Sequence, residues 1–73
     1  MKQITERLVM ARINRTLVDG RQLLKCRPSS KMFARCGTYW LQGADGSIVQ
    51  DHIDLETMGR ELGVIAKWER MMR

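Results

Sequence analysis

The chain has few of the residues that enzymes and metal centres most often use. Among its 73 residues there is one histidine, His52, and there are two cysteines, Cys26 and Cys36, with nine residues between them. Structural zinc sites use much closer cysteine pairs, and a four-ligand site in this chain would have to recruit carboxylates. The sequence therefore predicts no metal site and no other cofactor.

Long hydrophobic runs are missing as well, and no export signal is expected. No apolar run approaches the ~20 residues of a membrane span, and residues 1–7 lack the apolar core of a secretion signal. We expect a single small domain over residues 1–73, without a linker, in the cytoplasm and away from membranes. Both thiols are then expected to be free and buried as small apolar groups, with a disulfide or a reactive thiol as the alternatives.

Acidic residues are unevenly distributed along the chain. The formal net charge is +5, but residues 1–36 carry nine Lys or Arg and two acids, whereas residues 37–73 carry four Lys or Arg and six acids. No acid lies between Gly20 and Ala44, a stretch with five basic residues. The basic half could therefore face either another molecule or the acidic half of its own chain.

A nucleic acid is one such molecule. Clustered cations neutralise phosphates, and exposed aromatic rings stack on unpaired bases. Phe33, Tyr39 and Trp40 lie in or beside the basic stretch. The candidate nucleic-acid-binding residues are Arg7, Arg12, Arg15, Arg21, Lys25, Arg27, Lys31 and Arg35.

Residues 5–18 show the pattern of an amphipathic helix. Thr5 can cap its N-terminus, and Asp19-Gly20 can end it because glycine readily adopts the left-handed conformation. The apolar residues at helical spacing should form one buried face, made of Val9, Met10, Ile13 and Leu17.

The next segments are short and bounded by chain breakers. Residues 21–27 suit a strand, and a short helix almost as well, because Leu, Lys, Gln and Arg are good helix formers. After Pro28, Ser29 or Ser30 can cap a single helical turn over residues 31–35, which Gly37 ends.

Residues 38–53 show the clearest local signal, that of a β-hairpin. Strands at 38–42 and 47–53 contain aromatic and β-branched residues, and Asp45-Gly46 supplies the positive φ angles of a tight turn. Tyr39 and Trp40 point to alternate strand faces, so one of them is expected in the core.

A final helix is predicted from Leu55, with Asp54 as its cap. Its core-facing stripe continues through Met58, Leu62 and Ile65; Gly63 can end the helix, or the helix can continue over residues 65–73. The expected core is Val9, Ile13, Leu17, Leu41, Val49, Ile53, Leu55, Met58 and Leu62.

Two nucleic-acid-binding folds resemble parts of this pattern. Residues 58–64 resemble the centre of a helix-turn-helix, which implies a recognition helix over 65–73, although Glu69 stands where that motif has an apolar residue. With a strand at 21–27, the element order is similar to that of the double-stranded-RNA-binding domain. That resemblance implies basic residues at the start of the last helix, whereas this helix begins Asp54-Leu55-Glu56.

The C-terminal segment 68–73 mixes aromatic and apolar residues with charges. Trp, Met and Arg are enriched at protein interfaces, so the candidate partner interface is Trp68, Met71 and Met72. The alternative is that this tail packs on its own domain. An acid–base role for His52, alone or paired with Cys36, rests on a single histidine, so neither catalytic residues nor an enzyme are expected.

The sequence thus predicts an α+β fold. It has an N-terminal helix, a two- or three-stranded antiparallel sheet with a hairpin at about 38–53, and a C-terminal helix packed on one sheet face. For function, the pattern favours a small non-enzymatic protein that binds a protein partner or a second copy of itself. The alternative is a nucleic-acid-binding module that uses the basic surface of residues 7–35.

Overall fold

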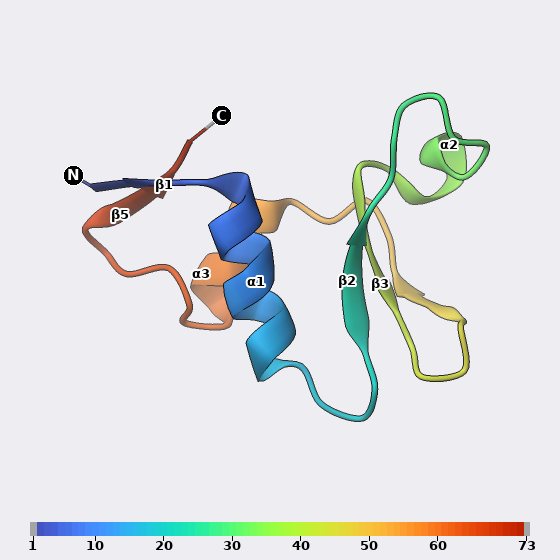
Figure 1. Ribbon diagram of the computed structural model, residues 1–73, viewed down its shortest axis with the longest axis horizontal. Coiled ribbons are helices and arrows are strands. Elements are labelled where there is room, and N and C mark those ends of the chain that lie inside the picture. The colour runs from blue at the N-terminus through green and yellow to red at the C-terminus, as the bar shows by residue number, and fades with distance from the viewer. Residues whose placement is uncertain (1, 73) are drawn as a thin grey trace. The chain divides into compact units, whose positions relative to one another are not determined.

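The computed structural model describes residues 2–72 and has the predicted mixed α+β architecture (Figure 1). An N-terminal helix is followed by a three-stranded antiparallel sheet and a C-terminal helix, which confirms the predicted fold class. The elements are β1 (Lys2–Ile4), α1 (Glu6–Thr16), β2 (Gln22–Lys25), α2 (Phe33–Cys36), β3 (Tyr39–Gln42), β4 (Ile48–Gln50), α3 (Leu55–Glu61) and β5 (Glu69–Met71).

The chain divides into two compact units. The described residues of unit 1 are 2–16 and 54–72, which contain β1, α1, α3 and β5. Unit 2 is Leu17–Ile53 and contains β2, α2, β3 and β4. Among the described residues, no helix is long and apolar enough to cross a membrane.

The two helices of unit 1 begin at the predicted caps and pack against each other (Figure 1). The Thr5 hydroxyl accepts a hydrogen bond from the Leu8 N–H (3.1 Å), and the Asp54 carboxylate accepts one from the Thr57 N–H (3.2 Å). Both contacts satisfy N–H groups that the first turn of a helix leaves unpaired.

The chain turns back after α3 instead of continuing as a helix. The N–H groups of Val64 and Ile65 both donate to the Gly59 carbonyl (2.9 and 3.3 Å), and Gly63 has a φ of 73°. A side chain at position 59 would meet Ile65, because a Cβ there would lie 2.5 Å from the Ile65 Cδ1. Of the two alternatives left open by the sequence, the structure shows the helix that ends before Gly63. The recognition helix that the helix-turn-helix resemblance implied is wrong, since residues 69–71 form β5.

The two ends of the described chain pair as a parallel sheet that the sequence analysis did not predict. Lys2 lies opposite Glu69, and Ile4 lies opposite Met71. Beyond this register, the Lys2 N–H donates to the Trp68 carbonyl and the Met72 N–H donates to the Ile4 carbonyl, each at 2.7 Å.

Unit 2 is built on the antiparallel sheet β2–β3–β4. The ambiguous segment 21–27 is a strand, in which Leu23 pairs with Leu41 and Leu24 with Trp40. The predicted hairpin is confirmed, with the Gly43 N–H donating to the Ser47 carbonyl (2.8 Å) and Gly46 at a φ of 85°.

A bulge in this hairpin places one predicted core residue in solvent. Leu41 pairs with Gln50, but Gln42 pairs with Ile48, so Val49 is an additional residue without a direct partner. Val49 is accordingly 46% exposed, and its assignment to the core was wrong.

The remaining core predictions are mostly confirmed. Val9, Ile13, Leu41, Ile53 and Leu55 are buried, whereas Leu62 is exposed because α3 has already ended at Glu61. Met10, Leu17 and Met58 are half-buried. The buried apolar residues that were not in the expected core are Ile4, Leu23, Cys26, Cys36, Tyr39 and Ile65.

Candidate binding surfaces

The first candidate surface is one face of the β1–β5 sheet in unit 1. Side chains alternate between the two faces of a strand, and burial alternates accordingly along β5. Trp68 (69% exposed), Arg70 and Met72 (48% exposed) face solvent, whereas Glu69 is buried and Met71 is half-buried. Gln3, which pairs with Arg70, is exposed as well. We call Gln3, Trp68, Arg70 and Met72 the outer face.

The outer face modifies the predicted partner interface. Trp68 and Met72 share one side of the strand, but the intervening Met71 belongs to the opposite side. In a helix, residues three and four apart share a face, so Trp68, Met71 and Met72 would lie together. In the strand, alternate residues share a face, and this places Arg70 and its partner Gln3 beside Trp68.

The inner side of this sheet holds an ion pair. The Glu69 Oε1 accepts hydrogen bonds from the Arg12 Nη1 at 2.8 Å and from the Ala66 N–H at 2.9 Å. The Arg12 Nη1 also donates to the Val64 carbonyl (3.0 Å). The hydrogen bond from Arg12 is the largest cause that lowers the pKa of Glu69 from 4.5 to about 2, and the same contact raises the pKa of Arg12.

Arg12 is therefore occupied by the acidic C-terminal half of its own chain. This was the alternative to nucleic-acid binding, and it accounts for one of the eight cationic candidates. Arg7 and Arg15 belong to unit 1 with Arg12. The structure groups the other five candidates in unit 2: Arg21, Lys25, Arg27, Lys31 and Arg35.

Side chains of α3 cover the free edge of β5. The Met71 N–H donates to the Glu56 Oε2 (3.3 Å), and the Arg60 Nη2 donates to the Glu69 carbonyl (3.0 Å). Glu56 and Arg60 also contact each other at 3.4 Å, one helical turn apart. An uncovered strand edge can pair with another chain, and this ion pair closes β5 to such pairing.

The second candidate surface is a pocket of about 460 Å³ in unit 2, beside β2, β3 and the loop after β2. Trp40 and Leu24 are direct partners across the two strands, so their half-buried side chains lie on the same sheet face. Tyr39 is 8% exposed, which confirms that one of the two adjacent aromatic residues belongs to the core. The lining residues are Leu24, Lys25, Cys26, Arg27, Ser29, Ser30, Met32 and Trp40.

Local hydrogen bonds define the loop that borders this pocket. The Ser30 N–H donates to the Arg27 carbonyl (2.9 Å), with Pro28 at the second position of the turn, which proline favours. The Ser30 hydroxyl accepts from the Met32 N–H (3.2 Å) just before α2. Sequence reasoning found the pocket's cations and Trp40. It did not find Leu24, because the pairing of Leu24 with Trp40 is not visible in one strand alone, and it did not find Met32, which the loop after β2 brings to the pocket.

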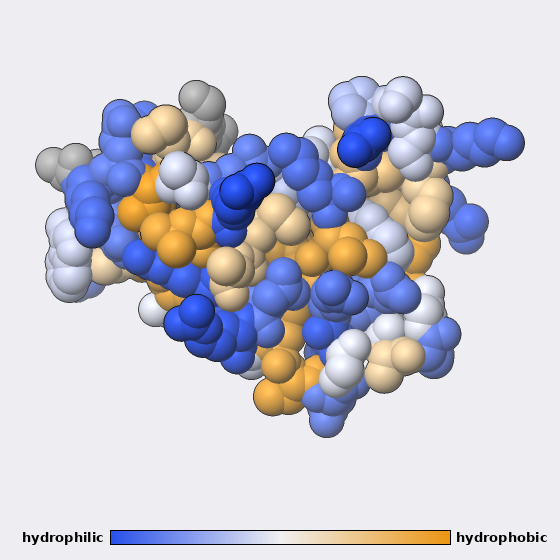
Figure 2. All heavy atoms as spheres, in the orientation of Figure 1, coloured by the Kyte–Doolittle hydropathy of each residue, from blue (hydrophilic) through white to orange (hydrophobic). Residues whose placement is uncertain are grey.

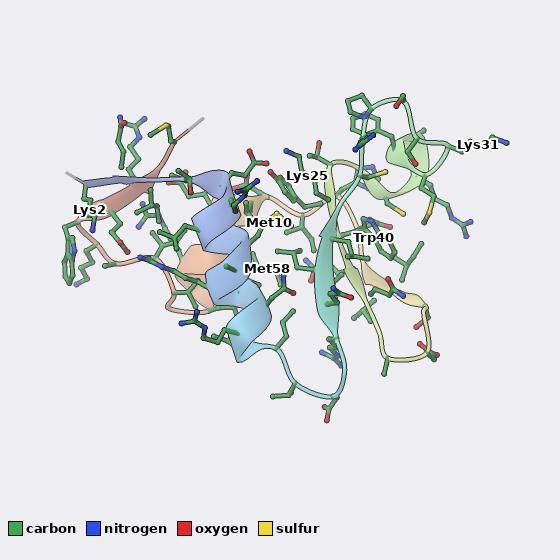
Figure 3. All side chains as sticks on the ribbon, in the orientation of Figure 1. Lys2, Met10, Lys25, Lys31, Trp40 and Met58 are labelled. Carbon is green, nitrogen blue, oxygen red and sulfur yellow. The ribbon has the colours of Figure 1, made fainter. Side chains whose placement is uncertain are left out.

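The basic residues near the pocket differ in their surroundings. The Lys25 Nζ lies 6.0 Å from the centroid of the Tyr39 ring, within the range of a cation–π contact. Lys31 points outward from the loop before α2 (Figure 3). Figure 2 shows further hydrophilic side chains that project from the part of unit 2 around α2.

The residues considered for catalysis meet through the backbone, because the His52 N–H donates to the Cys36 carbonyl (2.7 Å), but their side chains differ in exposure. Cys36 is fully buried, whereas the exposed His52 imidazole contacts the Asp51 carboxylate at 3.1 Å. Both cysteines are free and buried, as expected. Within residues 2–72 there is no group of three or more His, Cys, Asp or Glu that could hold a metal ion.

Comparison with known proteins identifies no family for this chain: no family model matches it, and neither a curated protein nor a solved structure does.

Proposed function

We propose that this protein acts by binding rather than by catalysis, and that its partner is a second copy of the same chain docked on the outer face. The observation that carries this proposal is the exposure of Trp68 and Met72, at 69% and 48%, on the same face as Arg70. We place the protein in the cytoplasm, where a reducing environment suits its two free thiols.

The composition of the outer face supports a protein interface. Trp, Met and Arg are enriched in the centres of interfaces, and Trp and Arg are the commonest residues whose truncation costs most of the binding energy. A domain of 73 residues also has little core of its own, and association adds buried apolar surface.

Charge complementarity supports a second copy as the occupant. A two-fold interface brings the same patch of both chains together, so residues that attract each other must both be present in that patch. Arg70 and Trp68 are such a pair, because a guanidinium is attracted to the face of an indole ring. In a face-to-face dimer, Arg70 of each chain contacts Trp68 of the other.

Sedimentation tests this proposal. We expect dimers at micromolar concentration and tighter association as salt is added, because two chains of net charge +5 repel each other at low ionic strength. Trp68→Ala should weaken the dimer roughly thirtyfold or more, the loss expected for a central tryptophan.

The matched control is Val18→Ala in unit 2, which truncates another apolar residue of similar exposure, at 65%. Val18→Ala should dimerise like the unmodified chain. A chain that stays monomeric at high concentration and high salt would overturn self-association and would leave the outer face to a different protein. Equal weakening by Trp68→Ala and Val18→Ala would overturn the assignment of the surface.

A further inference from the structure

We propose that the pocket of unit 2 binds one nucleotide of a single-stranded nucleic acid, with the base stacked on Trp40 and the adjoining phosphate held by Arg27. This site is built from residues of unit 2 alone, so the proposal does not depend on self-association through unit 1. It assigns the basic surface of the sequence analysis to particular residues and to one chemical class of ligand.

The apolar part of the pocket suits a nucleobase. Trp40 is half-buried, so its ring is held by the sheet while part of it stays accessible, and Leu24 lies beside it on the same face. Every base has a flat π-face that stacks on an aromatic ring whatever its sequence. The pocket has a volume of about 460 Å³ and is open to solvent on one side, so a base can stack in it while its sugar and phosphate stay at the open side.

The polar part of the pocket suits a phosphate. Arg27 presents a planar fork of donors that matches phosphate oxygens. Lys25 takes no part in this contact, because its Nζ lies near the Tyr39 ring on the sheet face opposite Trp40. Ser29 and Ser30 bring hydroxyl groups to the same lining, where they can donate to further phosphate oxygens. None of the lining residues is acidic, so no side-chain carboxylate of the pocket repels the anion.

The pocket selects single strands because a base in a duplex cannot reach it. Paired bases are stacked on both faces, and an aromatic side chain stacks on a base only after that base has been splayed out. Double-stranded-RNA-binding domains bind duplex RNA with basic residues at the start of their last helix. Here α3 is capped by Asp54 and begins with Leu55 and Glu56, so those basic residues are missing. A phosphorylated peptide would use the cations but would leave Trp40 without a planar partner.

The test uses Trp40 as its own reporter. In the Trp68→Phe variant, Trp40 is the sole tryptophan, and its fluorescence is followed during titration with an oligothymidylate of roughly ten nucleotides, a length typical of small single-strand-binding sites. We expect quenching at low salt and an affinity that falls as salt rises. This salt dependence is opposite in sign to that of the proposed dimer, so the two proposals fail separately.

Two substitutions separate stacking from charge. Trp40→Leu, measured by anisotropy of a labelled oligonucleotide, should weaken binding roughly tenfold to a hundredfold, whereas Trp40→Phe should retain much of it. Arg27→Gln should weaken binding too. It should also make the slope of log binding constant against log salt concentration shallower by about 0.7, the contribution of one single-strand phosphate. Arg7→Gln in unit 1 removes the same charge and should leave both the affinity and the steepness unchanged.

Several results would overturn the proposal. Absence of quenching at low salt would show that the oligonucleotide does not bind at Trp40. Equal effects of Arg27→Gln and Arg7→Gln would show diffuse attraction to polyanions rather than a pocket. If Trp40→Leu is folded by circular dichroism and binds with unchanged affinity, stacking on Trp40 does not contribute to binding. A phosphoserine peptide that binds as tightly as the oligonucleotide would show recognition of phosphate alone.

Discussion

The two units of this protein are assembled from the chain in different ways. Unit 2 is one continuous segment, Leu17–Ile53, whose antiparallel strands follow one another along the chain. Unit 1 combines the first helix with the last one and joins β1 to β5 across almost the whole sequence. Local turn signals can therefore specify much of unit 2, whereas unit 1 depends on contacts between distant residues.

The net charges of the two units differ from the net charges of the two halves of the sequence. Residues 1–36 have nine Lys or Arg against two acids, and residues 37–73 have four against six. Residues 1–16 and 54–73 together carry eight Lys or Arg and five acids, and residues 17–53 carry five and three. Folding thus replaces a sharply divided chain with two moderately basic units, because the acidic C-terminal segment joins the basic N-terminal helix.

The strongest way to probe unit 2 separately is to remove part of its core. Leu23 is 1% exposed and pairs with Leu41 of the central strand β3. Leu23→Ala should lower the free energy of unfolding by about 2–5 kcal/mol, because it removes buried methyl groups and leaves a cavity. Urea denaturation measures the loss.

The control for this substitution is Val49→Ala in the same sheet. Val49 is 46% exposed beside the bulge, so we expect a change within about 0.5 kcal/mol. A loss at Val49 comparable to that at Leu23 would contradict the bulged register and would restore the burial predicted from the sequence.

Acid should weaken unit 1 through Glu69. The pKa of Glu69 is lowered from 4.5 to about 2, chiefly by its hydrogen bond with Arg12, so the ionised form is favoured in the folded state. The resulting stability is fully present above the unfolded pKa and is lost as the pH falls from about 4.5 through about 2. Thermal unfolding midpoints across this range should show the loss.

Glu69→Gln should reduce stability at neutral pH and should flatten its decline in acid, because the amide cannot ionise. The control is Glu61→Gln, which alters an exposed glutamate at the end of α3 and should keep the full acid-dependent loss. An unchanged acid profile in Glu69→Gln would mean that the contact with Arg12 does not stabilise unit 1.

A smaller effect is expected at the N-terminus of α3. Asp54→Ala removes the acceptor of the Thr57 N–H, and loss of such a cap costs about 1 kcal/mol. Asp54→Ser restores a capping oxygen and should recover most of the loss. Chemical denaturation of the three chains gives this comparison, and a neutral Asp54→Ala would show that α3 is held by packing alone.

Local chemistry made parts of the fold predictable. Thr5 and Asp54 cap helices where the sequence placed them, and Asp45-Gly46 turns the hairpin because glycine accepts a positive φ. Segment 21–27 could not be assigned, since its residues suit both helix and strand and only pairing with β3 distinguishes them.

The candidate surfaces were predictable to a similar degree. Trp68 and the cations of unit 2 were identified from residue type and charge, but their neighbours were not. Residue type alone groups Met71 with Trp68, whereas strand alternation places Met71 on the other side of β5. Charge alone makes Arg12 a candidate for ligand binding, whereas the structure pairs Arg12 with Glu69.

By itself, the sequence determined the α+β class, the helix caps, the hairpin and the acid-free stretch from Gly20 to Ala44, because each depends on residues close together in the chain. Only the tertiary structure decided that the chain's ends pair as β1 and β5, that Arg12 meets Glu69, and that Trp40 faces a pocket with Arg27. These features join residues distant in sequence or set by strand register, and their energies come from pairing and burial that no local pattern records.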